Sequence, residues 1–522
     1  GGLAPMHAPA FAGVASLDPP YKYSMPSSLS NAAQDLIDRG EPAAALSLLS
    51  QGTGADVLAA RASAHLALGD AEAALSSATE GRRLAPDNAA AAFNIGRALM
   101  MLAEPERAVE AFAAAERGFP GVAEISARLG GAAFVAGDNE LAVAALSRAL
   151  DRAPGHADAF HQMAQLLFQR DDPAVLDRFL DAAVARGGAS AFRAASTLAR
   201  LGRRSEALAA LLAVSPESRP SPAVETLAAE ICRDEGDLPR AFDHARKALA
   251  LSPGDPDVAL PLAKLLLIDG AFAEAEALAR AGLAASPQHQ LWLALLWTAL
   301  AARGLPDAAG MIDPEQDVAI FDLAPPPGYA SIAAFNAALS VELEPLHASA
   351  GPPIAQSVHG GSQTRRPLQS LKTPAIAAFF KAIVAPIDTF IARMPNEARH
   401  PFYGRTDKGW RVNGAWSVAL KRGGRHASHV HPGGWISSAY YVAVPPSASD
   451  APENAGWFTI GAPPFAARGL GAPLRVIEPV PGRLVLFPSY CWHGTVPFAG
   501  EDRRLTVAFD CVPARTEAAA RA

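Results

Sequence analysis

Residues that interrupt helices recur every 34 positions through the first three hundred residues of the chain. One set of positions holds Gly69, Ala103, Gly137 and Asp171, and then Gly202, Gly236, Gly270 and Gly304. A second set holds Pro86, Pro120 and Pro154, and then Pro253 and Pro287. Only the step from Asp171 to Gly202 is shorter, at 31 residues. Because glycine and proline end helices, this period predicts a chain of short helices joined by turns.

The stretch 89–121 illustrates how one period is expected to fold. Gly96 lies in the first helix, where the absence of a side chain allows a partner helix to approach closely, and Leu99 follows on the same face. The apolar positions of the second helix, three and four residues apart, are Ala108, Phe112 and Ala115. Pro120 then ends this helix. Each period therefore predicts two helices that pack through small and apolar residues.

This 34-residue pattern resembles the tetratricopeptide repeat family over roughly Asn31–Gly310, with about eight helix pairs. The pair around Arg170–Gly188 departs from the pattern. The resemblance implies an all-α solenoid that buries its core between neighbouring repeats and leaves a concave surface. We expect this groove to bind a peptide or protein. The other interpretation is a scaffold that only holds the second domain or a dimer.

The chain changes character after Pro314. Helical spacing of apolar residues continues only in Ile332–His347 and Pro374–Met394. Alternating, strand-like segments then follow, separated by Gly/Pro clusters: Trp416–Leu420, Ile436–Val444, Trp457–Ile460, Leu484–Phe487 and Leu505–Phe509. Short strands bounded by turns predict a small antiparallel barrel or jelly roll.

Three histidines in this second part are candidate metal ligands. In a strand, residues two apart point to the same face, so His429 and His431 can converge on one point. His493 follows 62 residues after His431, and Arg504 and Thr506 open a later apolar strand. Imidazoles suit Fe(II), and an arginine can bind the far carboxylate of a cosubstrate. This order predicts a mononuclear non-haem iron site with a carboxylate cosubstrate.

Residues from about Pro314 to Ala514 resemble the 2-oxoglutarate- and Fe(II)-dependent oxygenases with a double-stranded β-helix core. The matching motifs are His359–Thr364, Trp416–Val418, His429–Val442, Gly482–Ser489 and Arg504–Thr506. The resemblance implies that His493 is the distal iron ligand and that Arg504 binds 2-oxoglutarate. It also implies that Tyr441, with Ser437 on the same face and Thr506 nearby, contributes to the cosubstrate site.

One position departs from the family pattern. The family has His-x-Asp or His-x-Glu before the distant histidine, whereas His431 occupies the carboxylate position here. Either three imidazoles hold the iron, or water replaces the carboxylate and His431 has another role. A neutral third ligand leaves the iron one charge more positive than a carboxylate ligand would.

The resemblance implies hydroxylation of a C–H bond, coupled to conversion of 2-oxoglutarate and O₂ into succinate and CO₂. We expect a peptide or protein substrate docked by the repeats, and a small-molecule substrate remains open. One alternative is a cupin-type dioxygenase, which holds iron with three histidines and needs no 2-oxoglutarate. Another is a non-catalytic scaffold whose β domain keeps a structural metal or none.

Composition narrows the partners and the compartment. A net charge of −7 argues against a broad nucleic-acid surface, and we find no apolar run of the ~20 residues that span a bilayer. The first residues lack a basic segment followed by an apolar core, so we expect no signal peptide. Cys232, Cys491 and Cys511 are too dispersed for a disulfide framework or a thiolate zinc site. We therefore expect neither a nucleic-acid partner nor a membrane partner, and we expect a cytoplasmic location. The Ala- and Arg-rich composition is typical of a bacterial protein.

The predicted organisation has three parts. Residues 1–30 form a flexible N-terminal segment, residues 31–310 form the all-α tetratricopeptide solenoid, and residues 311–522 form the oxygenase-like domain. The fold class is therefore multidomain, with a helical solenoid followed by a double-stranded β-helix and flanking helices. His426 is expected beside the metal site or at the surface, and Tyr490, Trp492 and Trp416 are expected in the core.

Overall fold

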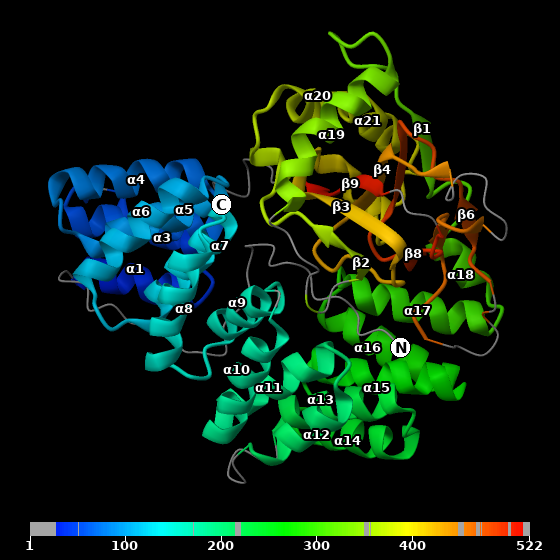
Figure 1. The fold of residues 1–522 in the computed structure, drawn as a ribbon, viewed down its shortest axis with the longest axis horizontal. Coiled ribbons are helices and arrows are strands. Elements are labelled where there is room, and N and C mark those ends of the chain that lie inside the picture. The colour runs from blue at the N-terminus through cyan, green and yellow to red at the C-terminus, as the bar shows by residue number, and fades with distance from the viewer. Residues whose placement is uncertain are drawn as a thin grey trace. The chain divides into compact units, whose positions relative to one another are not determined.

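The computed structural model describes residues 28–50, 52–170, 172–214, 221–348, 354, 357–446, 454–465, 470, 472–499 and 503–514. The described chain forms two compact units, residues 28–179 and residues 180–514 (Figure 1). Most of the segment predicted to be flexible lies outside the described residues, and the first helix begins at Ser28.

The first unit consists of helices in antiparallel pairs. They are α1 (Ser28–Asp38), α2 (Pro42–Leu49), α3 (Ala55–Leu68), α4 (Ala71–Leu84), α5 (Ala89–Met101), α6 (Pro105–Gly118), α7 (Ala123–Ala136), α8 (Asn139–Arg152), α9 (Ala157–Phe168) and the first half of α10 (Pro173–Arg186). The second unit continues the alternation with α11 (Gly188–Arg200), α12 (Arg204–Leu212), α13 (Pro222–Glu235), α14 (Leu238–Leu251), α15 (Pro256–Asp269), α16 (Phe272–Ala285), α17 (Gln290–Ala302) and α18 (Pro306–Met311).

The described periodic residues lie at the turns, as the sequence predicted, and Asp171 lies outside the described residues. Gly69 and Gly137 follow α3 and α7 in the left-handed conformation, with φ of 77° and 90°, which glycine adopts without steric cost. Pro120 lies just beyond the last residue of α6. A Cβ atom on Gly96 would lie 2.6 Å from the Phe112 ring, so the predicted close approach of α5 and α6 is confirmed. The all-α solenoid is therefore encoded by residues with restricted backbone preferences.

The C-terminal part of the second unit contains two antiparallel sheets and flanking helices. The large sheet has the order β1 (Ala319–Asp322), β7 (Arg483–Pro488), β4 (Ile436–Ala443), β9 (Arg504–Pro513), β3 (Trp410–His426) and β2 (Val358–Gln363). The small sheet has the order β6 (Arg475–Ile477), β5 (Phe458–Ile460) and β8 (His493–Thr495). This helical solenoid followed by an antiparallel β domain confirms the predicted fold class.

Helices cover one face of the large sheet. They are α19 (Ile332–Ala348), α20 (Pro374–Ala382) and α21 (Val384–Ala392), which gather beside β4 and β9 in Figure 1. Tyr440 on β4 points to these helices, where its hydroxyl donates to Asn336 at 2.6 Å and its ring packs on Phe379. Because side chains alternate along a strand, the neighbouring Tyr441 points to the opposite face, toward the small sheet.

The last repeats share one hydrophobic core with the β domain. Trp492 donates its indole N–H to Thr298 on α17 at 2.9 Å, and Tyr490 donates to the Met311 carbonyl at 2.5 Å. Both aromatic side chains are buried, as predicted. The predicted domain boundary at residues 310/311 stays a prediction, because this core is continuous across it.

The segment Pro374–Ala392 is, by length and composition alone, apolar enough to cross a membrane. Lys381 and Asp388 interrupt the apolar run of this segment. Core helices of soluble proteins pass the same test, and Phe379 and Ile387 from this segment are buried in the core. A single segment of this kind is weak support for a membrane span.

Replacing Gly282 with alanine is expected to destabilise the second unit. A Cβ atom there would lie 2.5 Å from the ring of Trp292, which is fully buried and cannot move away cheaply. Overpacking of this kind costs about 1–3 kcal/mol and outweighs the roughly 1 kcal/mol gained in helix propensity. Denaturant unfolding followed by tryptophan fluorescence measures the loss.

Gly254→Ala is the matched control, because a Cβ atom at Gly254 would have open space around it. We expect a change within about 0.5 kcal/mol for this variant. Equal stability of Gly282→Ala and Gly254→Ala would contradict the close packing of α16 on α17.

Candidate active site

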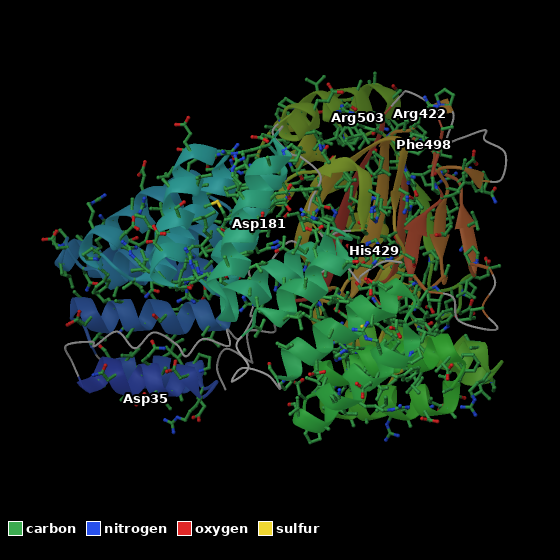
Figure 2. All side chains as sticks on the ribbon, turned by 60° about the horizontal axis from the view of Figure 1, so that its bottom comes forward. Asp35, Asp181, Arg422, His429, Phe498 and Arg503 are labelled. Carbon is green, nitrogen blue, oxygen red and sulfur yellow. The ribbon has the colours of Figure 1, made fainter. Side chains whose placement is uncertain are left out.

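The three predicted histidines lie between the two sheets. His429 and His431 belong to the extended connection between β3 and β4, and His493 begins β8. The prediction that His429 and His431 lie in a regular strand is therefore wrong. Instead, His429 forms an isolated β-bridge with His493, and the two residues exchange backbone hydrogen bonds of 2.9 and 3.0 Å. The connection is still extended, so the two side chains point to the same side. Figure 2 labels His429, which is 5% exposed.

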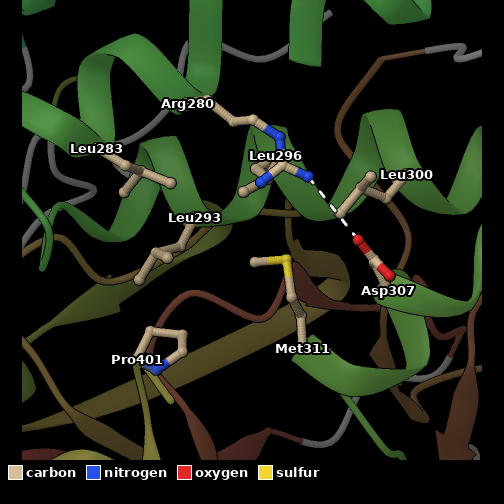
Figure 3. A pocket seen from close by; sticks show the side chains of 8 residues that line it. All are labelled: Arg280, Leu283, Leu293, Leu296, Leu300, Asp307, Met311 and Pro401. Carbon is tan, nitrogen blue, oxygen red and sulfur yellow. Dashed lines mark ion pairs between the residues drawn. The ribbon is translucent and has the colours of Figure 1, made fainter. Parts of the chain in front are cut away.

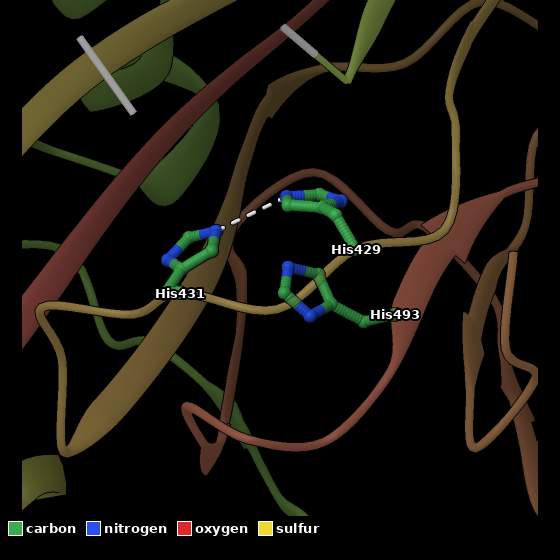
Figure 4. A group of neighbouring side chains, drawn as sticks. All are labelled: His429, His431 and His493. Atoms are coloured by element: carbon green, nitrogen blue, oxygen red, sulfur yellow. Dashed lines mark hydrogen bonds between the residues drawn. The ribbon is translucent and has the colours of Figure 1, made fainter. Parts of the chain in front are cut away.

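The imidazole rings converge on one point. One nitrogen from each of His429, His431 and His493 lies within 4.8 Å of the other two, and the Nε2 atoms of His429 and His431 are 3.1 Å apart (Figure 4). Each of the three residues is at most 5% exposed. Among the described residues, no other group of three or more His, Cys, Asp or Glu side chains has this geometry.

The outward nitrogen of each ring contacts an oxygen acceptor. Nδ1 of His429 donates to the Ala427 carbonyl at 2.8 Å, and Nδ1 of His493 donates to the Cys491 carbonyl at 2.9 Å. Nδ1 of His431 donates to a carboxylate at 2.6 Å. Because these oxygens only accept, each Nδ1 carries the proton and each Nε2 keeps a lone pair directed inward.

This arrangement suits a cation. Burial, together with the neighbouring His493 and His431, holds the pKa of His429 well below its usual value, so its ring is neutral near pH 7. Two lone pairs 3.1 Å apart repel each other unless a positive ion lies between or beside them. The three rings therefore have the donor chemistry of a site for a divalent transition metal.

The carboxylate on His431 belongs to Asp510, which the sequence analysis missed. Asp510 lies on β9 opposite Ser437 and is 6% exposed. Its Oδ1 also accepts from the Ser437 hydroxyl at 2.7 Å. The signal was available, because positions 504, 506, 508 and 510 alternate onto one face of a strand. The Ser437 hydroxyl, predicted to line the cosubstrate site, is thus hydrogen-bonded to Asp510 beside His431.

The other predicted residues meet at the opposite end of this face. Thr506 on β9 pairs with Tyr441 on β4, and the Arg504 guanidinium lies 5.1 Å from the centroid of the Tyr441 ring. Between this group and Asp510, the same strands carry Ala439 and Ala508, which are partly exposed although their neighbours along each strand are buried. Small side chains thus separate the arginine from the histidines.

Arg504 is a buried cation with incomplete partners. It is 2% exposed, and its Nη1 donates to the Gly456 carbonyl at 2.6 Å. Apart from the interaction between the Arg504 guanidinium and the Tyr441 hydroxyl, the Arg504 Nε and this buried hydroxyl have no hydrogen-bond partner among the described residues. By contrast, its neighbour Arg503 lies near the surface and pairs with Glu344 at 2.6 Å (Figure 2). The described residues place no acidic side chain on this buried guanidinium, so the site favours an anion.

His426 and Trp416 surround the histidines. The His426 ring is stacked at 6.0 Å from His429, and Ser357 lies within hydrogen-bond distance of both rings, at 3.2 and 3.3 Å. Burial, followed by the charge of Arg504, lowers the pKa of His426 to about 3. Trp416, predicted in the core, is half-buried with its ring 5.5 Å from His431. These groups lie beside the metal-binding nitrogens.

A separate pocket of about 250 Å³ lies between α16, α17, α18 and Pro401 (Figure 3). Leucine and methionine side chains form most of its wall, and Arg280 and Asp307 form an ion pair of 3.9 Å at its edge. Because it contains one carboxylate and no histidine or cysteine, it lacks a set of metal ligands.

Comparison with protein families agrees with this geometry. The family described as "Putative 2OG-Fe(II) oxygenase" matches residues 414–510, and tetratricopeptide repeat families match residues 59–121, 102–157, 192–256 and 233–310. The chain therefore combines tetratricopeptide repeats with a C-terminal segment that matches this oxygenase family. The predicted fusion is confirmed, and the matched oxygenase segment contains the three histidines, Arg504 and Asp510.

Solved structures with similar repeats have low overall similarity. MamA from Desulfovibrio magneticus RS-1 is 20% identical, with a TM-score of 0.27 over 30% of this chain and 94% of its own. PilF from Pseudomonas aeruginosa is 15% identical, with a TM-score of 0.30 over 45% of this chain and 96% of its own. A chain of the Cut9–Hcn1 hetero-tetramer of the APC/C is 18% identical, with a TM-score of 0.30 over 52% of this chain and 46% of its own. The comparison with curated proteins found no match.

The three histidines are expected to bind a divalent metal that stabilises the folded chain. At a Co(II) concentration 100-fold above its dissociation constant, the stabilisation amounts to about 2.7 kcal/mol. A melting-temperature shift on Co(II) addition measures this, and we expect His493→Ala to lose it. His359→Ala is the control, because His359 is exposed and outside the group. A shift that survives in His493→Ala would assign the metal to another site.

Proposed function

We propose that the protein is an Fe(II)- and 2-oxoglutarate-dependent dioxygenase that hydroxylates an as yet unidentified substrate. The observation that carries this proposal is the combination of three inward-facing Nε2 atoms with a buried arginine that has no acidic partner among the described residues. The two groups lie on one face of the β domain, separated by small residues. The match to the oxygenase family supports the same conclusion.

The residues fit both groups that this chemistry needs. His429, His431 and His493 would hold the iron, since neutral imidazoles suit Fe(II). Arg504 and the Tyr441 hydroxyl would bind the distal carboxylate of 2-oxoglutarate through charge-assisted hydrogen bonds, with Thr506 beside them. When bound, iron and 2-oxoglutarate supply the oxidation of a C–H bond by O₂, with release of succinate and CO₂.

The protein's own contribution is orientation and exclusion of water. The carbonyls of Ala427 and Cys491 hold two of the rings in the tautomer that leaves Nε2 free. Phe487, whose ring lies 4.6 Å from His493, and Trp416 provide apolar surroundings near the metal-binding atoms. A buried, apolar environment strengthens the electrostatic contacts to the cosubstrate and limits side reactions with water.

The substrate class is proposed from the repeats. Tetratricopeptide repeats generally mediate protein interactions through their concave surface. We propose a peptide or protein substrate that the repeats present to the β domain, with a small molecule as the alternative outcome. The free, buried thiols of Cys232, Cys491 and Cys511 are compatible with the cytoplasmic location that we propose.

A three-histidine dioxygenase that needs no 2-oxoglutarate is the second candidate. The observation in its favour is the absence of a carboxylate at position 431, which gives three imidazoles instead of two. Arg504 favours the first proposal, because the described residues give this buried cation no acidic partner and a carboxylate cosubstrate would supply one. The two candidates differ in whether turnover requires 2-oxoglutarate.

Arg504→Ala is expected to weaken 2-oxoglutarate binding by about 10- to 100-fold, since a hydrogen bond to a charged group contributes about 1.5–3 kcal/mol. The measurement is succinate formation by anaerobically purified, Fe(II)-loaded protein after addition of 2-oxoglutarate and O₂, without a prime substrate. Arg503→Ala is the matched control, because it removes an adjacent arginine that pairs with Glu344 near the surface. We expect the control to retain the wild-type KM for 2-oxoglutarate.

Three outcomes separate the candidates. Succinate formation that falls in Arg504→Ala and persists in Arg503→Ala supports the proposal. If no succinate forms, a titration of 2-oxoglutarate into the Fe(II)-loaded wild type decides, and binding that depends on Arg504 supports the cosubstrate assignment. Metal-loaded protein that binds no 2-oxoglutarate would contradict it. Oxygen consumption without 2-oxoglutarate would then favour the three-histidine alternative.

A further inference from the structure

We propose that Asp510 is a positioning residue that delivers negative charge to the metal through His431. In this arrangement His431 donates more electron density to the metal than His429 or His493 does, and Asp510 acts on the metal without contacting it. The inference rests on the metal site proposed above, because it concerns how one of that site's ligands is oriented and polarised.

The hydrogen bonds at the three rings differ in one respect. His429 and His493 each donate Nδ1–H to a backbone carbonyl, at 2.8 and 2.9 Å. His431 donates to a carboxylate, and at 2.6 Å this is the shortest of the three bonds. A carboxylate acceptor carries a full negative charge, so it draws the Nδ1 proton more strongly and raises the electron density at Nε2.

Asp510 is held rigidly for this role. The Ser437 hydroxyl donates to the same Oδ1 at 2.7 Å and lies 2.8 Å from the Ser489 hydroxyl. The backbone N–H of His431 donates to the Ser489 carbonyl at 2.9 Å, so the backbone of His431 is hydrogen-bonded to the same serine whose hydroxyl contacts Ser437. The carboxylate and the imidazole are therefore fixed relative to each other from both sides.

The surrounding chain leaves room for this network. A Cβ atom on Gly434 would collide with the Ser489 side chain and would lie 3.3 Å from Cγ of Asp510. The register of β4 and β9 places Ser437 directly opposite Asp510. The turn after His431 thus has a glycine where any side chain would displace the serine that fixes the carboxylate.

The electrostatics explain why the carboxylate is buried here. Asp510 is 6% exposed, and a buried carboxylate is costly unless hydrogen bonds and a nearby positive charge compensate it. A divalent metal on Nε2 of His431 provides such a charge across the imidazole ring. Three neutral ligands alone leave the metal dipositive, whereas Asp510 adds one negative charge to the buried site without using a coordination position.

The first test is the affinity of Asp510→Asn for Co(II), measured anaerobically from the visible absorption of the bound metal. Loss of a carboxylate behind a metal-binding histidine costs about 10- to 100-fold in metal affinity, and we expect a loss of this size. Asp317→Asn is the matched control, since Asp317 is also buried and accepts from Tyr403 at 2.6 Å away from the histidines. We expect this control to bind Co(II) as tightly as the wild type.

A second variant distinguishes an electrostatic role of Asp510 from a purely structural one. His431→Asp in the Asp510→Asn background places the carboxylate directly on the metal and removes it from behind the ring. We expect the Co(II) affinity of this double variant to return to within about 10-fold of the wild type, because the net charge of the site is restored. The Fe(III)/Fe(II) potential provides a second readout, and we expect it to become more positive in Asp510→Asn.

The outcomes keep the inference separate from the proposed function. Wild-type protein that binds no Co(II) would contradict the metal site itself. Two results would overturn the role of Asp510 and leave the metal site intact. One is a Co(II) affinity that Asp510→Asn leaves unchanged, and the other is a double variant that binds Co(II) no more tightly than Asp510→Asn. If Asp510→Asn does not fold, Ser437→Ala replaces it, because it frees the carboxylate while retaining its charge. A severalfold loss of affinity is then expected, and unchanged affinity would count against the inference.

Discussion

The β domain is organised around three buried imidazole rings whose inward nitrogens cannot satisfy one another. Oxygen acceptors hold each Nδ1 proton on the outside, so the lone pairs of His429 and His431 are only 3.1 Å apart. The Ser357 hydroxyl lies 3.3 Å from Nε2 of His429, and a cation would interact favourably with all three inward nitrogens. The isolated bridge between His429 and His493, which joins the β3–β4 connection to the small sheet, places the rings in this position. The chemistry of the site therefore depends on the pairing of two segments far apart in the sequence.

Strand β9 arranges the charges of the site along one face. Arg504 and Thr506 lie at one end, Ala508 leaves space in the middle, and Asp510 lies behind His431 at the other end. The two end groups have opposite sign, and the buried arginine has no acidic partner among the described residues. In the proposed function, an anionic cosubstrate near Arg504 and a metal cation beside His431 would compensate these two charges. One strand thus positions both charged groups of the site.

The parts of the fold that the sequence predicted are those in which a residue type limits its own backbone. Left-handed glycines such as Gly137 and helix-ending prolines such as Pro120 determine the repeat, so its period was readable directly. His429 and His431 were predicted on one face because their spacing of two is a local property. Asp510 was missed because its role depends on pairing with Ser437 across two strands, and the alternation along β9 indicates its face but not its partner. The short strands β6 and β8 were missed for a similar reason, and so was the contact between Trp492 and Thr298 that joins the last repeats to the β domain.

The most direct test of this account is a crystal structure of the anaerobically Fe(II)-loaded protein, with diffraction data recorded at the iron absorption edge. The account predicts a single iron atom bonded to Nε2 of His429, His431 and His493, with Asp510 still hydrogen-bonded to Nδ1 of His431 and not bonded to the metal. Iron bound directly to Asp510, iron at a different site, or a structure in which only two of the three histidines contact the metal would contradict it.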